Sequence, residues 1–323
     1  MRATTRRMPG MLVAGVTALI SGVSVFVNSY GVHDFASPAL YTTAKNIVAF
    51  LFLALAATVG LRSRRRDANS LGANFVTSEH TDTATHGVGY WLALAYVGII
   101  GGGLAFVLFF DGLASSTPAA AAFWRDTMVL WVAAVAVPIV REKVRWWNVV
   151  AIVLLVTGQV IVAGGVGHLA FTNGEIDVLA STVLWAVEVV VAKRLLRAMA
   201  PARVALVRMG VGAVALLVYL GATGAAANLV ALDAHQLLWI LLTGLLLSGY
   251  VATWMTALAR ARALDVTSVL VASAGVTWLL QVIAGTVTPV TSALGLVLVM
   301  AGAGLVLAAG VTAARPLRRP ALR

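Results

Sequence analysis

The sequence contains no cysteine among its 323 residues, which excludes disulfide bonds, thiolate metal sites and a cysteine nucleophile. Charge is also scarce. Asp, Glu, Lys and Arg make up 11% of the chain, whereas soluble globular proteins carry about 25%. Because 61% of the residues are hydrophobic, the chain cannot cover itself with a polar surface. This composition predicts an integral membrane protein.

Motifs for catalysis and nucleotide binding are missing as well. The chain has no GxxxxGK[ST] phosphate loop, no HExxH and no GxSxG. It therefore carries no ATPase, and any uphill transport must draw on an ion gradient. His80 and His86 lie near Glu79 and Asp82, but their spacing fits no zinc site. We therefore expect no metal, no cofactor and no catalytic residues.

Ten apolar stretches of membrane-spanning length follow one another along the chain. We expect spans at 11–29, 39–61, 89–110, 117–140, 147–165, 177–195, 204–222, 236–259, 266–286 and 293–313. Most connections are short, which makes neighbouring helices antiparallel. The exception is a polar segment, residues 62–88, which is predicted to be a loop. The sequence thus predicts an all-α, polytopic membrane protein with ten transmembrane helices.

Basic residues are distributed unevenly between the two sides of the membrane. If the N-terminus is cytoplasmic, 20 of the 23 Lys and Arg fall in cytoplasmic segments, and the outer loops hold none. The positive-inside rule then places both termini, residues 1–10 and the basic tail 314–323, in the cytoplasm of an inner or plasma membrane. Because the basic residues gather on one side of the membrane, we expect the basic loops to contact lipid headgroups and not nucleic acid.

Two parts of the sequence follow the same plan. SPALYTTAKNIVAF begins the second predicted span and APARVALVRMGVGA the seventh. In each, a cation follows seven residues after a proline: Lys45 after Pro38, and Arg208 after Pro201. Residues 11–165 and 166–313 are therefore expected to be two five-helix repeats. Because five is an odd number, the second repeat is inverted, which is characteristic of secondary transporters.

With these features the chain resembles an EamA-type member of the drug/metabolite transporter superfamily. The resemblance also rests on FFDGLASSTPAAAAF, on REKVRWW and on the glycine pattern of the fifth and tenth spans. It implies two inverted five-helix halves and export of small metabolites, amino acids or drugs by alternating access. Glu142 fills the place of a Glu that often ends the fourth helix in the family. Thr286 stands at the corresponding place in the second half, where Glu would be expected.

Charged side chains also occur inside predicted spans, where they usually mark a functional path. Arg125 and Asp126 lie in the span 117–140, and Glu188 lies at a comparable depth in the span 177–195. We expect Arg125 to face the bundle interior and to pair with Glu188. Such a group is either a structural ion pair or part of the substrate or proton path.

Two shallower cations, Lys45 and Arg208, have two interpretations. Their long side chains could reach the lipid headgroups, or they could gate the path or attract substrate. Polar and aromatic residues also share faces of several spans. The candidate pathway residues among them are Ser24, Asn28, Trp185, Tyr250, Trp254, Thr277 and Gln281. Interhelical hydrogen bonding and packing would explain the same pattern.

Three classes of function are compatible with these features. The first is a secondary transporter whose partners are a small-molecule substrate and membrane lipids. In this hypothesis H⁺ is the coupling ion, with Glu188 as its carrier and Asp126 as the alternative. The second class is a membrane scaffold or receptor, which would need no charges in a cavity. The third is a lipid-modifying enzyme, which would need a catalytic cluster at the membrane surface, and the sequence shows none.

Overall fold

The computed structural model describes residues 7–70, 87–116, 118–142, 144–162, 171–286 and 289–312. The helices in chain order are α1 (Arg7–Gly31), α2 (Pro38–Ser70), α3 (Val88–Ala95), the π-helical segment η2 (Tyr96–Leu104), α4 (Ala105–Ser115), α5 (Pro118–Asp126), α6 (Met128–Val140), α7 (Trp146–Val162), α8 (Asn173–Leu195), α9 (Pro201–Ala222), α10 (Ala234–Arg260), α11 (Ala263–Leu270), α12 (Ser273–Ile283) and α13 (Pro289–Thr312). Short 3-10 turns cover Val32–Asp34 and Ala226–Val230. The all-α prediction is confirmed for these residues.

Several helices continue directly into the next. α3, η2 and α4 form one rod, and its middle turns are wider than those of an α-helix. α5 and α6 are separated by Thr127 alone, and α11 and α12 by Val271 and Ala272. The backbone angles at these three residues stay right-handed helical, so the two rods are locally irregular but not unwound. The number of ten transmembrane helices and the inverted relation of the repeats stay predictions.

Seven helices in the described residues are long and apolar enough to cross a membrane. They begin at Gly10, Pro38, Val88, Pro201, Ala234, Ala263 and Ala293. α8 is long enough but carries five charged residues, and α7 has only 17 residues. The irregular turn at Thr127 separates α5 from α6, and each of the two is short. The chain is a multi-pass membrane protein.

Proline and capping residues set several helix starts. Proline's fixed φ angle and missing N–H group suit the first helical position. Four helices, α2, α5, α9 and α13, begin at Pro38, Pro118, Pro201 and Pro289. At the start of α10, Asp233 and Gln236 form a capping box in which each side chain accepts a hydrogen bond from the other's backbone.

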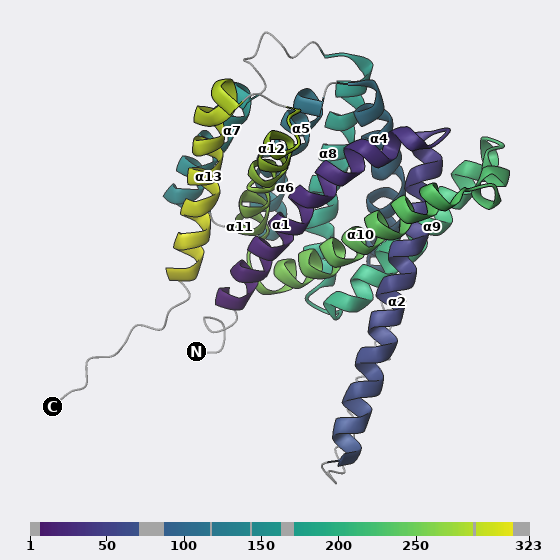
Figure 1. The fold of residues 1–323 in the computed structure, drawn as a ribbon. Helices are drawn as coiled ribbons and strands as arrows, with labels where there is room; N and C mark the ends of the chain where they lie inside the picture. Colours follow the sequence, from purple (N-terminus) through teal and green to yellow (C-terminus); the bar gives the residue numbers. More distant parts are fainter. Residues whose placement is uncertain are drawn as a thin grey trace.

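α2 is longer than the sequence predicted. The span was expected to end at residue 61, but the helix continues through Ser70, and its far end projects from the bundle in Figure 1. The run RSRRRDANS contains no proline or glycine that would end the helix. The rest of the predicted loop, residues 71–86, lies outside the described residues, as does the basic tail 314–323. The predicted N-terminal segment enters α1 at Arg7.

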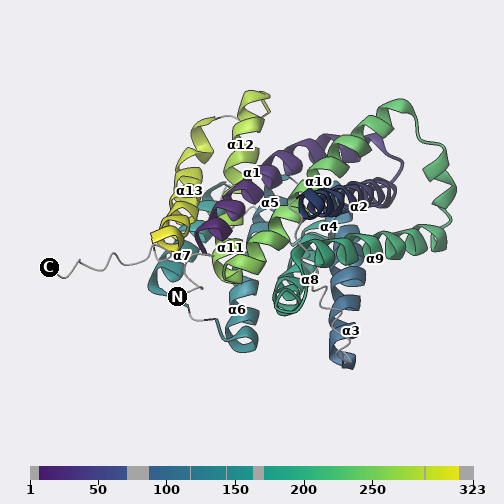
Figure 2. The ribbon, with the colours of Figure 1, turned by 90° about the horizontal axis from the view of Figure 1, so that it is seen from below.

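Helices from early and late parts of the chain pack against each other. α1 lies along α10 and also contacts α12, and α7 lies along α13 (Figures 1 and 2). α2 packs on α9 and α10, and α4 packs on α8. Glycine permits the closest approaches: a Cβ atom on Gly22 or Gly158 would come under 3.0 Å from atoms of the facing helix. The core is therefore shared between the two parts of the chain.

Candidate functional site

A cavity between nine helices brings together most of the predicted site residues. The space not filled by atoms is about 970 Å³, a volume that includes open solvent. Helices α1, α2, α4, α5, α6, α8, α9, α10 and α11 contribute to its lining. Ten of the twelve predicted residues line it: Ser24, Asn28, Lys45, Arg125, Asp126, Trp185, Glu188, Arg208, Tyr250 and Trp254.

The other two predicted residues, Thr277 and Gln281, lie on α12 outside this lining. The hydroxyl of Thr277 donates a hydrogen bond to the carbonyl oxygen of Gly22 on α1 (2.9 Å). It also lies 3.1 Å from the carbonyl oxygen of Ser273, one turn earlier. Thr277 therefore joins two helices, which was the alternative interpretation of this polar stripe.

Glu188 pairs with Arg208. Nε of Arg208 donates to Oε1 of Glu188 (2.5 Å), and Nη2 donates to Oε2 (3.1 Å). The prediction that Arg125 pairs with Glu188 is therefore wrong. α8 and α9 are neighbours joined by a short connection. Glu188 lies seven residues before the end of α8 at Leu195, and Arg208 lies seven residues after the start of α9 at Pro201. The two side chains consequently meet at the same depth.

The glycine run of η2 contacts this ion pair. The carbonyl oxygen of Gly101 accepts hydrogen bonds from Nη2 of Arg208 (3.1 Å) and from Nε1 of Trp185 (3.0 Å). A Cβ atom on Gly101 would come under 3.0 Å from the carboxyl group of Glu188, and one on Gly102 would come equally close to the carbonyl oxygen of Arg208. Only glycine permits this contact, and the π-helical turn directs a carbonyl group toward the pair.

Arg125 and Asp126 occupy the last turn of α5. Nη2 of Arg125 donates to the hydroxyl of Ser21 on α1 (2.8 Å). Its Nη1 lies 3.8 Å from Oδ1 of Asp126, so the adjacent residues form only a loose ion pair. Oδ2 of Asp126 accepts a hydrogen bond from Nε2 of Gln159 on α7 (2.6 Å). The helical turn at Thr127, immediately after these two side chains, is irregular.

Lys45 is 2% exposed and lines the cavity. Its Nζ donates to Oδ1 of Asn28 (3.0 Å) and lies 3.6 Å from the ring centroid of Phe110 and 4.7 Å from that of Tyr41. The interpretation that Lys45 and Arg208 reach the headgroups is therefore wrong. Each cation finds an oxygen acceptor on a neighbouring helix, so each side chain turns into the bundle.

Asn28 is held in one orientation. Its Oδ1 accepts a second hydrogen bond, from the hydroxyl of Tyr41 (2.6 Å). Its Nδ2 donates to the carbonyl oxygen (2.6 Å) and the hydroxyl (3.0 Å) of Ser24. The amide oxygen thus faces two donors and the amide nitrogen faces two acceptors. Asn28 therefore presents a fixed, neutral oxygen to Lys45.

Aromatic rings form much of the remaining wall. Trp185 contacts Phe106 edge-on at 5.2 Å between ring centroids and Phe109 at 5.3 Å. Tyr250 stacks on Trp254 with centroids 6.0 Å apart and planes 12° from parallel. The phenylalanines of α4 were not among the predicted site residues. A phenylalanine inside an apolar stretch carries no pattern that separates a cavity wall from a lipid-facing surface.

Hydrogen bonds join helix ends at one end of the bundle. The carboxylate of Glu142, just after α6, accepts hydrogen bonds from the backbone N–H groups of Ala263 (2.8 Å) and Leu264 (3.1 Å). It therefore caps the start of α11, where unpaired N–H groups favour a negative charge. This is the same Glu142 that carried part of the family resemblance.

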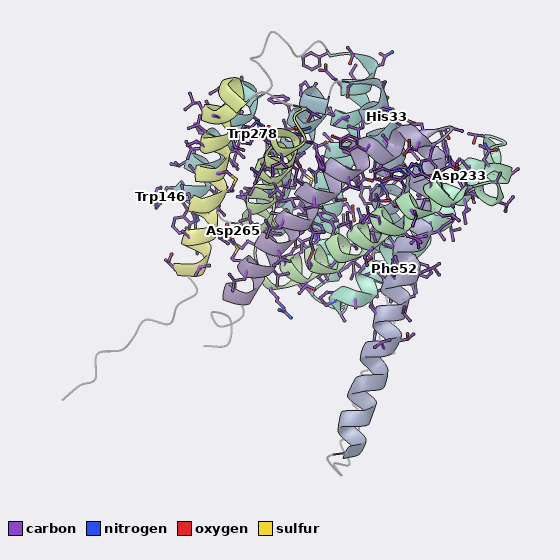
Figure 3. The ribbon with its side chains drawn as sticks, viewed as in Figure 1. His33, Phe52, Trp146, Asp233, Asp265 and Trp278 are labelled. Carbon is purple, nitrogen blue, oxygen red and sulfur yellow. The ribbon has the colours of Figure 1, made fainter. Side chains whose placement is uncertain are left out.

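A second cluster lies at the same end. Oδ1 of Asp265 accepts from Nδ2 of Asn148 (3.0 Å), and Oδ2 accepts from Nε of Arg262 (2.7 Å). The ammonium group of Lys193 on α8 donates to two carbonyl oxygens at the end of α10. Figure 3 shows Asp265 at this end, and Asp233 near the opposite end of α10. Polar contacts thus join α7, α8, α10 and α11.

Metal binding was not expected from the sequence. The described residues contain no group of three or more His, Asp and Glu that could hold a metal ion. His80 and His86, with their acidic neighbours, lie outside the described part of the chain. The arrangement that the structure does provide is a cavity with charged and aromatic walls, suited to a small organic molecule.

The fold and cavity define a multi-pass helical membrane protein with ionisable groups around an internal cavity, as in transporters. The EamA-like transporter family matches residues 8–164 and again residues 172–308. The chain belongs to this family, and the resemblance to EamA-type members of the drug/metabolite transporter superfamily is confirmed. Proteins of this family are membrane transporters and not enzymes.

A solved structure, described only as "Crystal structure of protein", has a similar fold. Its TM-score is 0.66 at 17% sequence identity, and the match covers 92% of this chain and 98% of that chain. At this identity the likeness concerns the fold alone. No curated protein matches the sequence.

Proposed function

We propose that the protein is a secondary transporter that exports a small organic molecule by alternating access between residues 11–165 and residues 166–313. The observation that carries this proposal is the charged cavity itself. Five charged side chains line it, and they come from helices of both parts of the chain. Ionisable groups inside membrane spans usually mark a substrate or ion path. The helical turns at Thr127 and at 271–272, in the fourth and ninth predicted spans, are irregular, and residues beside both turns line the cavity.

The contacts of Glu142 and Lys193 support a conformation that is closed toward the cytoplasm. Both residues lie in segments that the positive-inside rule assigns to the cytoplasmic side. They hold the end of α10 and the start of α11. For the cavity to open on that side, the backbone groups of these helix ends must be released.

Coupling to protons would occur at a carboxyl group of the cavity. Glu188 and Asp126 are the two carboxyl groups in its lining. A proton on Glu188 would remove the charge that holds Arg208, and so would loosen α8 from α9. A proton on Asp126 would change its contacts with Arg125 and Gln159. Either event links proton binding to helix packing.

Transport in proteoliposomes tests this coupling. The substrate would be a ligand found by thermal-shift screening of the purified protein, since a ligand at about 100 times its Kd stabilises by about 2.7 kcal/mol. An imposed pH difference should drive its accumulation. If Glu188 is the carrier, Glu188→Gln should abolish accumulation but keep exchange of labelled for unlabelled substrate, because exchange moves no net proton.

Asp126→Asn is the matched control, because it also converts one cavity carboxyl group to an amide. Loss of accumulation in Asp126→Asn alone would make Asp126 the carrier. Full accumulation in both variants would contradict proton coupling through this cavity.

Orientation in the membrane can be measured separately. We propose that both termini and residues 62–88 face the cytoplasm of an inner or plasma membrane. Because the chain has no cysteine, single cysteines can be introduced without background. An impermeant maleimide should label His235→Cys in intact cells, and should label Ser70→Cys only after permeabilisation. Labelling of Ser70→Cys in intact cells would show the opposite orientation.

A further inference from the structure

The charged lining of the cavity points to the class of its substrate. We propose that the cavity binds a small organic monoanion, a carboxylate on an aromatic body, and that Lys45 pairs with the carboxylate. This inference rests on the proposed transport function, because it assigns the substrate class of the same cavity.

The lining is not electrically balanced. Its charged side chains are the cations Lys45, Arg125 and Arg208 and the anions Asp126 and Glu188. The four charges other than Lys45 form two pairs, with N–O distances of 2.5 Å and 3.8 Å. Lys45 belongs to no ion pair within the described part of the chain. The lining therefore has a formal charge of one positive unit, located at Lys45, and a monoanion balances it.

The equivalent cations of the two halves of the chain have different partners. Lys45 and Arg208 each lie seven residues after the proline that begins their helix. Arg208 contacts the carboxylate of Glu188 on the helix that precedes its own. Lys45 contacts the neutral amide of Asn28 on the helix that precedes its own. An ammonium group kept from water is unfavourable without an opposite charge. A carboxylate from outside would supply the charge that the chain supplies itself in the second half.

The ammonium group of Lys45 has N–H donors that could bind such a partner. An ammonium group has three N–H donors, and Asn28 accepts one of them. Trp185, Tyr250 and Trp254 provide aromatic surfaces on other walls of the same cavity. Aromatic walls with a few polar groups are the usual surroundings of a bound organic molecule. The cavity thus offers a charged anchor for one end of a ligand and aromatic surfaces for the other.

A matched series of indoles tests the assignment. Indole-3-propionate carries only a carboxylate, tryptophan adds an ammonium group, tryptamine carries only the ammonium group, and 3-methylindole is neutral. Calorimetric titration of the purified full-length protein should show indole-3-propionate binding at least about 10-fold more tightly than tryptamine or 3-methylindole, because it alone gains a charge-assisted hydrogen bond without a like charge. Equal affinities, a preference for tryptamine or no binding by any of them would overturn the proposal.

Two variants identify the anchor. Asn28→Asp keeps the size of the side chain but places a resident carboxylate next to Lys45, as Glu188 does for Arg208. It should weaken indole-3-propionate binding by about 10- to 100-fold, and so should Lys45→Met. Both should bind 3-methylindole as the wild type does, which also shows that they are folded. Unchanged affinity of Asn28→Asp for indole-3-propionate would overturn the role of Lys45.

Uptake into proteoliposomes separates this inference from the proposed function. Tight binding of indole-3-propionate without its movement across the membrane would contradict transport and leave the substrate site intact. Transport of tryptamine in preference to indole-3-propionate would contradict the monoanion assignment and leave the transport function standing. Transport of indole-3-propionate that is lost in Asn28→Asp would support both.

Discussion

Replacing Arg208 with methionine should lower the free energy of unfolding by about 3–5 kcal/mol, because it leaves a buried carboxylate without its partner. The side chains of Arg208 and Glu188 are 5% and 4% exposed, and two hydrogen bonds join them. Arg125→Met is the matched control. It removes one hydrogen bond to Ser21 and a loose contact with Asp126, so we expect a loss of about 1–2 kcal/mol. Unfolding by sodium dodecyl sulfate in mixed micelles measures both.

A double-mutant cycle then identifies the partner of Glu188. Glu188→Gln combined with Arg208→Met should recover part of the stability that each single change loses, since the pair is removed together. Glu188→Gln combined with Arg125→Met should be additive. The reverse pattern would restore Arg125 as the partner of Glu188 and contradict the ion pair between α8 and α9.

Gly102→Ala should be comparably severe, with a loss of about 3 kcal/mol or more. The added methyl group would come under 3.0 Å from the backbone carbonyl oxygen of Arg208, and a backbone atom cannot give way as a flexible side chain can. Overpacking usually costs about 1–3 kcal/mol. Here the shift of α9 would also draw Arg208 away from Glu188. Folded yield and the same unfolding assay measure the effect.

Gly15→Ala is the control for this change. Gly15 lies in α1 and has nothing within 4 Å of its hypothetical Cβ atom. Alanine favours a helix interior over glycine by about 0.5–1 kcal/mol, so this variant should be as stable as the wild type or more stable. If Gly102→Ala were equally tolerated, the close contact between η2 and α9 would not matter for folding.

The sequence predicts the helices well where a long apolar stretch is the main feature. α13 (Pro289–Thr312) lies close to the predicted span 293–313 because nothing but a membrane helix explains so long an apolar stretch. The end of α2 was predicted poorly. Hydropathy marks where the chain becomes polar, but the arginine-rich run after residue 61 is a good helix former, so the helix continues in polar sequence.

The charged residues of the cavity lining were predictable, because charged side chains stand out in apolar spans. The pairing within it was not. The predicted span began at 204, whereas α9 begins at Pro201, so Arg208 was expected to lie at a shallower depth than Glu188. One usable signal was missed: Glu188 and Arg208 lie equally far from the short connection between their helices. The phenylalanines of α4 gave no signal at all.

The packing of α1 on α10 and of α7 on α13 has a consequence for biosynthesis. A ribosome delivers the first five helical rods to the membrane before their packing partners have been made. Until α10, α12 and α13 are inserted, lipid covers the small-residue faces around Gly22 and Gly158. The two sequence repeats therefore assemble as one unit, because each needs the other to complete its packing. Neither half, made alone, would have a complete core, and halves made as separate chains would have to find each other in the bilayer before either was protected from degradation.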